Sequence, residues 1–136
     1  MKLSVYLNEG ILKPSVHDMT IKQFMKRTGK TDERDALIWA CRKGAVEIIK
    51  KLIDKGVDIN YHEEGAGNIG ATPLMYAVAY EQMDAVKVLL ELGADVNIRT
   101  LKRPQGYNQI FSALEYADTY GLEDIADLLV KYGAKG

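Results

Sequence analysis

The sequence predicts an all-α fold, a solenoid of paired antiparallel helices, because one stretch of the chain is repeated three times. Residues 35–60 align without a gap with residues 72–97, and a third copy covers residues 112–135. Four columns hold one residue type in all copies: Leu37, Leu74 and Leu114; Ala40, Ala77 and Ala117; Leu52, Leu89 and Leu129; Gly56, Gly93 and Gly133. Such columns are typical of stacked units that bury their apolar faces against neighbouring units.

The first helix of each copy is predicted from the residue that opens it. Asp35, Thr72 and Ser112 each carry a side-chain oxygen that can cap a helix N-terminus. Pro73 follows Thr72, and proline favours the first helical position. We therefore expect a helix to begin at each of these three caps.

A second helix is predicted after Gly44, Glu81 or Gly121, because apolar residues there keep helical spacing. These residues are Ile48, Ile49, Leu52 and Ile53; Val86, Leu89 and Leu90; and Ile125, Leu128 and Leu129. The glycine at the end of each copy stands where a helix ends in a left-handed residue. Glu81 occupies a column of glycines, and a left-handed backbone at Glu81 would cost about 1 kcal/mol.

The second copy resembles the ankyrin repeat most clearly. It opens with Gly70-Ala-Thr-Pro-Leu74 and closes with Leu89-Leu-Glu-Leu-Gly-Ala-Asp-Val-Asn97. The resemblance covers residues 35–135 and implies an ankyrin-like α-solenoid with hairpin-like finger loops between the copies. It also implies a concave groove lined by the first helices, and a function in protein binding. We expect the repeats in residues 31–136, at about 35–67, 68–107 and 108–136.

Residues 1–30 lie outside the repeats and are predicted to form an N-terminal cap. Residues 3–12 alternate apolar positions around a turn-like Asn8-Glu-Gly10, as a small hairpin does. Thr20 and Gln23 have capping-box spacing, Phe24 lies on the apolar face of the predicted helix, and Gly29 ends it. Such a helix would cover the end of the stack. The alternative is that this segment is a partner-binding arm.

Composition restricts the class of protein. The chain has 136 residues, a formal charge of −1 and one cysteine, Cys41. We expect one soluble domain that is a monomer on its own. A cytoplasmic location is expected, because the N-terminus lacks the apolar segment of a secretory signal and a single cysteine cannot form an internal disulfide. The near-zero charge gives no pull toward nucleic acid or an anionic membrane.

The loops between the copies are one place where the copies differ. The step from Leu37 to Leu74 is 37 residues and the step from Leu74 to Leu114 is 40 residues, against a family period of about 33. Loops of opposite charge would favour a partner with complementary patches; alternatively they pair with each other or face solvent. The candidate partner-binding residues are Tyr61, Glu63 and Glu64 in the first loop, and Arg99, Lys102, Arg103 and Tyr107 in the second.

The first helices also place aromatic residues in equivalent positions. Trp39, Tyr76 and Tyr116 share one column, and Lys43, Tyr80 and Tyr120 share a column one turn further on. Tryptophan and tyrosine are enriched at binding hot spots. Alternatively, the side chains in the column of Trp39 belong to the core. The column of Tyr80 should be exposed, because it also holds Lys43 and lysine is rarely buried. We add these six residues to the candidate partner-binding set.

No catalytic, metal or cofactor site is expected. His17 and His62 are the two histidines, and neither has the spacing of a metal pair or of a nucleophile's base. His62-Glu63-Glu64 are consecutive loop residues that point in different directions. Cys41 shares a column with Val78 and Asp118 and is typical of a helix residue.

We therefore predict a non-catalytic protein-binding module, an inhibitor or adaptor that grips a partner protein with its groove and finger loops. One alternative is a bacterial immunity protein that blocks a toxin. An alternative of another class is a metal protein or enzyme that uses His62, Glu63, Glu64 or Cys41. A third is self-association through an end of the stack. Asp124, Asp127 and Lys131 are expected to face solvent on the last helix and to protect that end.

Overall fold

The computed structural model describes residues 19–63, 70–101 and 111–135, and these ranges form seven α-helices. The helices are α2 (Ile21–Thr28), α3 (Glu33–Lys43), α4 (Val46–Lys55), α5 (Pro73–Ala79), α6 (Met83–Glu91), α7 (Ala113–Thr119) and α8 (Glu123–Lys131). The predicted all-α solenoid of helix pairs is confirmed. The hairpin predicted in residues 3–12 lies outside the described residues.

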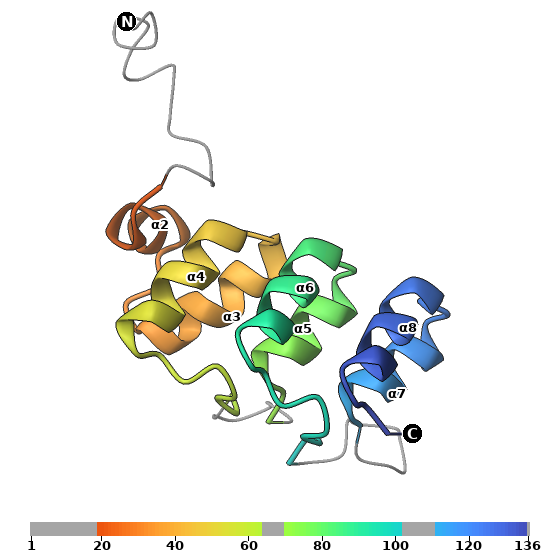
Figure 1. The fold of residues 1–136 in the computed structure, drawn as a ribbon. Coiled ribbons are helices and arrows are strands. Elements are labelled where there is room, and N and C mark those ends of the chain that lie inside the picture. The colour runs from red at the N-terminus through yellow and green to blue at the C-terminus, as the bar shows by residue number, and fades with distance from the viewer. Residues whose placement is uncertain (1–18, 64–69, 102–110, 136) are drawn as a thin grey trace, which may run out of the picture.

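The helix pairs stand side by side in two layers (Figure 1). The first helices α3, α5 and α7 form one layer, in which α3 packs against α5 and α5 against α7. The second helices form the other layer, in which α4 packs against α6 and α6 against α8. At the N-terminal end of the row, α2 packs against both α3 and α4.

The repeated columns form the core of the stack. Leu37, Leu74 and Leu114 are buried, and so are the leucines of the second helices, Leu52, Leu89 and Leu129. Ala40, Ala77 and Ala117 are each 0% exposed. A methyl side chain at this column lets neighbouring helices approach closely, so the residue types shared by the copies are explained by packing.

Two of the three predicted helix starts are confirmed. Thr72 and Ser112 are N-caps that accept hydrogen bonds from the backbone N–H groups of Met75 and Glu115, at 3.4 and 3.2 Å. The prediction for Asp35 is wrong, because α3 begins at Glu33. Its N-cap is Asp32, whose Oδ1 accepts from the Arg34 backbone N–H at 2.8 Å. The first copy thus begins its helix nearly one turn earlier than the others.

The capping box predicted at Thr20 and Gln23 and the left-handed backbone considered for Glu81 are both present. Thr20 and Gln23 form a capping box at the start of α2, and Gly29 ends that helix in the left-handed conformation. Glu81 has φ 55° and is the one non-glycine residue with positive φ in the described ranges. The other members of its column, Gly44 and Gly121, have φ 71° and 68°. Glu81 therefore holds a left-handed conformation that suits glycine better than glutamate.

Candidate protein-binding surface

Five aromatic side chains lie on the first helices or at their C-caps and form the aromatic stripe: Trp39, Tyr76, Tyr80, Tyr116 and Tyr120. The ring centroids of Tyr76 and Tyr80 are 6.4 Å apart, and those of Tyr116 and Tyr120 are 6.3 Å apart. Both pairs are stacked. The predicted one-turn spacing thus brings the two aromatic columns together on α5 and again on α7.

The two columns differ in exposure. Tyr80 and Tyr120 are 46% and 59% exposed, as predicted from the lysine that shares their column. Trp39, Tyr76 and Tyr116 are half-buried and pack against the hydrophobic core. The column of Trp39 is therefore neither wholly core nor wholly surface, since each ring anchors on the core and keeps part of its area open.

A hollow of about 110 Å³ opens between α5 and α7. It is lined by three tyrosines of the stripe together with smaller apolar residues: Tyr76, Tyr80, Tyr116, Ala71, Met75 and Ala79. Its wall is mainly apolar. Such a lining suits an inserted apolar side chain.

Cations surround the Trp39 end of the stripe. The guanidinium carbon of Arg42 lies 4.1 Å from the ring centroid of Trp39 and 4.8 Å from that of Tyr80. The Nζ atoms of Lys30 and Lys43 lie 4.7 and 5.4 Å from the Trp39 centroid. We name Lys30, Arg42 and Lys43 the cation cluster. The sequence interpretation named Lys43 and missed the other two; Arg42 was detectable because it follows Trp39 by three residues on a helix.

Glu63, in the first loop, is bonded to the stripe. Its carboxylate accepts a hydrogen bond from the Tyr76 hydroxyl, and its backbone N–H donates to the Ala71 carbonyl at 3.0 Å. Burial raises the pKa of Tyr76 well above its usual range, and the Glu63 carboxylate raises it further. Glu63 therefore holds the base of its loop against α5 and keeps Tyr76 protonated.

The second loop is held in the same way. Arg99 forms an ion pair with Glu115 on α7, with 2.7 Å between Nη1 and Oε1. The Thr100 backbone N–H donates to the Phe111 carbonyl at 2.8 Å, and Arg99 and Ser112 form an isolated antiparallel β-bridge. The described charges of the two loops thus bond to the helix that follows each loop, and not to each other.

Four candidate residues, Glu64, Lys102, Arg103 and Tyr107, lie outside the described residues. Tyr61 is half-buried at the base of the first loop, where the Arg34 guanidinium lies 5.0 Å from its ring centroid. Tyr61 therefore lies at the base of the first loop, beside α3. All thirteen candidates remain predictions as partner contacts.

The residues of the metal or enzyme alternative are not gathered into a site in the described ranges. No group of three or more His, Cys, Asp and Glu residues there is arranged to hold a metal ion. Cys41 is 0% exposed, and burial raises the pKa of its thiol. The Nε2 atom of His62 is buried and has no hydrogen-bond partner among the described residues.

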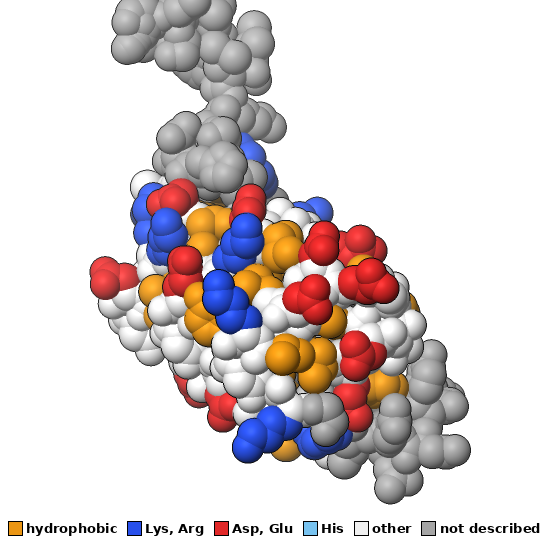
Figure 2. Space-filling model, turned by 45° about the vertical axis from the view of Figure 1, so that its right-hand side comes forward, with side chains coloured by type: hydrophobic (Ala, Val, Ile, Leu, Met, Phe, Trp, Pro, Cys, Tyr) orange, Lys and Arg blue, Asp and Glu red, His pale blue; other side chains and the backbone are white. Residues whose placement is uncertain are grey.

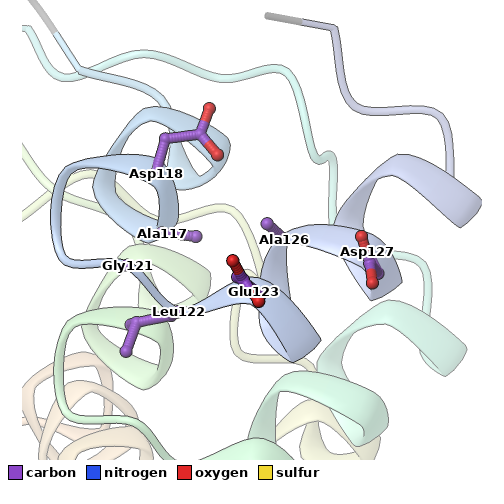
Figure 3. A pocket seen from close by; sticks show the side chains of 7 residues that line it. All are labelled: Ala117, Asp118, Gly121, Leu122, Glu123, Ala126 and Asp127. Carbon is purple, nitrogen blue, oxygen red and sulfur yellow. The ribbon is translucent and has the colours of Figure 1, made fainter.

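The C-terminal end of the stack has a hollow of about 410 Å³ between α7 and α8. Ala117 and Ala126 point toward one another across it, and carboxylates of Asp118, Glu123 and Asp127 stand around it (Figure 3). Asp118 occupies the column of Cys41 and Val78, which are 0% exposed. Asp124, Asp127 and Lys131 are exposed as predicted.

Charge is divided along the stack. On the face drawn in Figure 2, Lys and Arg side chains gather toward the N-terminal end, and Asp and Glu side chains dominate the other half. Residues 19–63 hold ten Lys or Arg and seven Asp or Glu, whereas residues 70–101 and 111–135 hold four and nine. The small net charge of the whole chain therefore hides a basic half and an acidic half.

Within the described ranges, no helix combines the length and the apolar character needed to cross a membrane. The described structure is a solenoid of helix pairs whose first helices present a surface rich in aromatic residues.

Comparison with known proteins identifies the family. The model for ankyrin repeats in three copies matches residues 9–100. The match takes in part of the N-terminal segment that we placed outside the repeats. The chain belongs to the ankyrin repeat family, and ankyrin repeats are generally protein-protein interaction modules.

Similar curated proteins are much longer than this chain. The E3 ubiquitin-protein ligase Ufd4 of Drosophila melanogaster is 30% identical over 129 residues, which are 94% of this chain and 4% of that protein. Human ankyrin repeat and KH domain-containing protein 1 is 33% identical over 105 residues, 77% of this chain and 4% of that protein. An ankyrin repeat-containing protein of Schizosaccharomyces pombe is 38% identical over 63 residues, 46% and 28% of the respective chains. The chain thus spans less than a third of each of these relatives.

Proposed function

We propose that this chain is a non-catalytic module that binds a partner protein through the aromatic stripe and the loops beside it, as an inhibitor or adaptor. The observation that carries the proposal is the row of rings across α3, α5 and α7. Tyr80 and Tyr120 are about half exposed at their outer edge, and a hollow opens between the two helices that carry them. Tyrosine and tryptophan give large rigid contact area with a polar group at its edge.

The charged residues of the loops support this role indirectly. Glu63 and Arg99 fix the bases of their loops to α5 and α7, so the stripe and the loop bases form one preorganised surface. A surface that is already ordered loses less conformational entropy when a partner binds. A nucleophilic cysteine finds no comparable support, since Cys41 is inaccessible.

The proposal is tested by affinity capture from an extract of the source cells. The test variant is Tyr80→Ser/Tyr120→Ser, and the matched control is Tyr132→Ser, which alters a tyrosine that is 42% exposed at the end of α8. Circular dichroism establishes first that all variants are folded. We expect a protein that the wild type and the control retain and the test variant loses. Equal retention by all three would place the binding surface elsewhere.

A further inference from the structure

The charges on the first helices change sign along the aromatic stripe. α3 ends with Arg42 and Lys43, α5 has no charged residue, and α7 carries Glu115 and Asp118. The stripe is therefore basic at the Trp39 end, carries the Glu63 carboxylate on the Tyr76 hydroxyl at its middle, and is acidic at the Tyr120 end. A ligand that lies along it meets a different electrostatic environment at each end.

The cation cluster has no carboxylate partner in the described ranges. None of the four ion pairs there includes Lys30, Arg42 or Lys43. All three cations instead lie within 5.4 Å of the centroid of one ring, that of Trp39. Like charges gathered on one half-buried ring repel each other, and a bound carboxylate would relieve that repulsion.

Arg42 joins the cation cluster to the hollow. Its guanidinium lies against Tyr80, and Tyr80 also lines the hollow between α5 and α7. A ligand with a carboxylate on Arg42 can therefore place an apolar side chain in the hollow one or two residues further on, since an extended chain advances about 3.3 Å per residue.

We infer that the bound segment of the partner protein is acidic and carries an apolar side chain beside its carboxylates. The carboxylates bind Lys30, Arg42 and Lys43, and the apolar side chain fills the hollow lined by Tyr76, Tyr80 and Tyr116. This inference rests on the proposed function and names the chemistry of the partner. Asp118 repels an acidic residue at the other end, where Glu115 is already paired with Arg99, so Asp118 sets the direction in which the segment lies.

A single-stranded nucleic acid also combines negative charge with groups that stack on aromatic rings. It fits less well, because a uniformly charged backbone that follows the stripe would meet the carboxylates of Glu63 and Asp118. The described residues from position 70 onward are net acidic as well. A protein segment can confine its negative charge to the Trp39 end.

The test is a selection of random twelve-residue peptides, displayed on phage, against the immobilised full chain. We expect the enriched peptides to contain Asp or Glu next to an aliphatic or aromatic residue. The best peptide is then synthesised with a fluorescent label, and its affinity is measured by anisotropy. Trp39 is the only tryptophan of the chain, so a change in its emission on binding would locate the peptide at the cation cluster.

The decisive variant is Arg42→Gln/Lys43→Gln, and its matched control is Lys87→Gln/Lys131→Gln, which removes the same charge from the second helices. We expect the first variant to bind the peptide at least about tenfold more weakly and the control to match the wild type. Added salt should weaken wild-type binding. Enrichment of neutral or basic peptides, no enrichment above the starting library, or equal affinity of the two variants would overturn the inference.

Two further arms separate the inference from the proposed function. If peptide binding is lost in Tyr80→Ser/Tyr120→Ser but unchanged in Arg42→Gln/Lys43→Gln, the stripe binds proteins and the assigned chemistry is wrong. If neither variant changes the affinity, both proposals fail. Tighter binding of a labelled single-stranded twelve-nucleotide DNA, sensitive to Arg42→Gln/Lys43→Gln, would overturn the choice of a protein segment.

Discussion

The Asn60 side chain ties the end of one repeat to the end of the next: its Oδ1 accepts a hydrogen bond from the backbone N–H of Asp95 at 2.9 Å. Asn97, which holds the same column in the second copy, accepts from the backbone N–H of Lys135 at 3.0 Å. Its amide also donates to the Gly133 carbonyl at 3.3 Å. The asparagine column is therefore a repeated link between neighbouring helix pairs.

Asn60→Ala should lower the free energy of unfolding by about 1 kcal/mol, because it removes one hydrogen bond between the first and second repeats. Urea unfolding followed by circular dichroism measures the change. Lys87→Ala, on the exposed side of α6, is the control and should change stability by less than about 0.5 kcal/mol. Equal effects of the two substitutions would show that the link contributes nothing measurable.

Glu81→Gly should stabilise the fold by about 1 kcal/mol, because glycine adopts positive φ without the steric cost that Glu81 carries. Gly44 and Gly121 already hold the equivalent positions in the other copies. Thermal unfolding gives the comparison. Glu81→Ala removes the charge but keeps the side-chain Cβ, so a gain of the same size in that variant would assign the effect to charge and contradict the argument.

Tyr76 should make stability fall at alkaline pH. Because its pKa is raised in the folded state, mainly by burial and then by Glu63, the folded protein keeps this proton longer than the unfolded chain does. The contribution is complete below the unfolded pKa of about 10 and is lost as the pH rises above that value. We expect the unfolding free energy of Tyr76→Phe to fall less steeply than that of the wild type between about pH 9 and 11.

The two curves for Tyr76 are compared by urea unfolding at each pH. At neutral pH, Tyr76→Phe should already be less stable by about 1 kcal/mol, because the hydrogen bond to Glu63 is lost. Parallel pH curves for the two proteins would mean that Tyr76 titrates alike in the folded and unfolded states.

Cys41 should resist thiol reagents in the folded protein. It is completely buried, and burial raises the pKa of its thiol, so the reactive thiolate is rare and shielded. We expect an aromatic disulfide reagent to modify it only as fast as the protein opens, and rapidly in urea. Immediate stoichiometric modification in native buffer would show an accessible thiol and reopen the enzyme alternative.

Local rules made much of the fold predictable. Thr72 and Ser112 are followed at once by helices. The glycines in the column of Glu81 indicated a left-handed backbone at that position. The start of the first helix was not predictable, because Asp32 and Asp35 are both good N-caps three residues apart. Sequence alone gives no reason to prefer Asp32 over Asp35 as the N-cap of α3.

The candidate site was predicted only in part. Helical spacing indicated the aromatic stripe, but half-burial of its inner rings depends on packing between repeats. Lys30 reaches Trp39 because α2 packs against α3, a contact that no local pattern reveals. The bonds of Glu63 to Tyr76 and of Arg99 to Glu115 likewise join residues 13 and 16 positions apart, across loops whose path the sequence does not determine.

Asp118 places a charge in the column where Cys41 and Val78 are buried against the next repeat. The interface between repeats is heterologous, since the surface that one repeat presents differs from the surface that it receives, and interfaces of this kind can extend into open filaments. Cys41 and Val78 present an uncharged side chain to the next repeat. A second molecule that stacked on the third repeat would have to bury the Asp118 carboxylate, which is costly without a cationic partner. The Asp118 carboxylate thus disfavours end-to-end association of separate molecules through the third repeat.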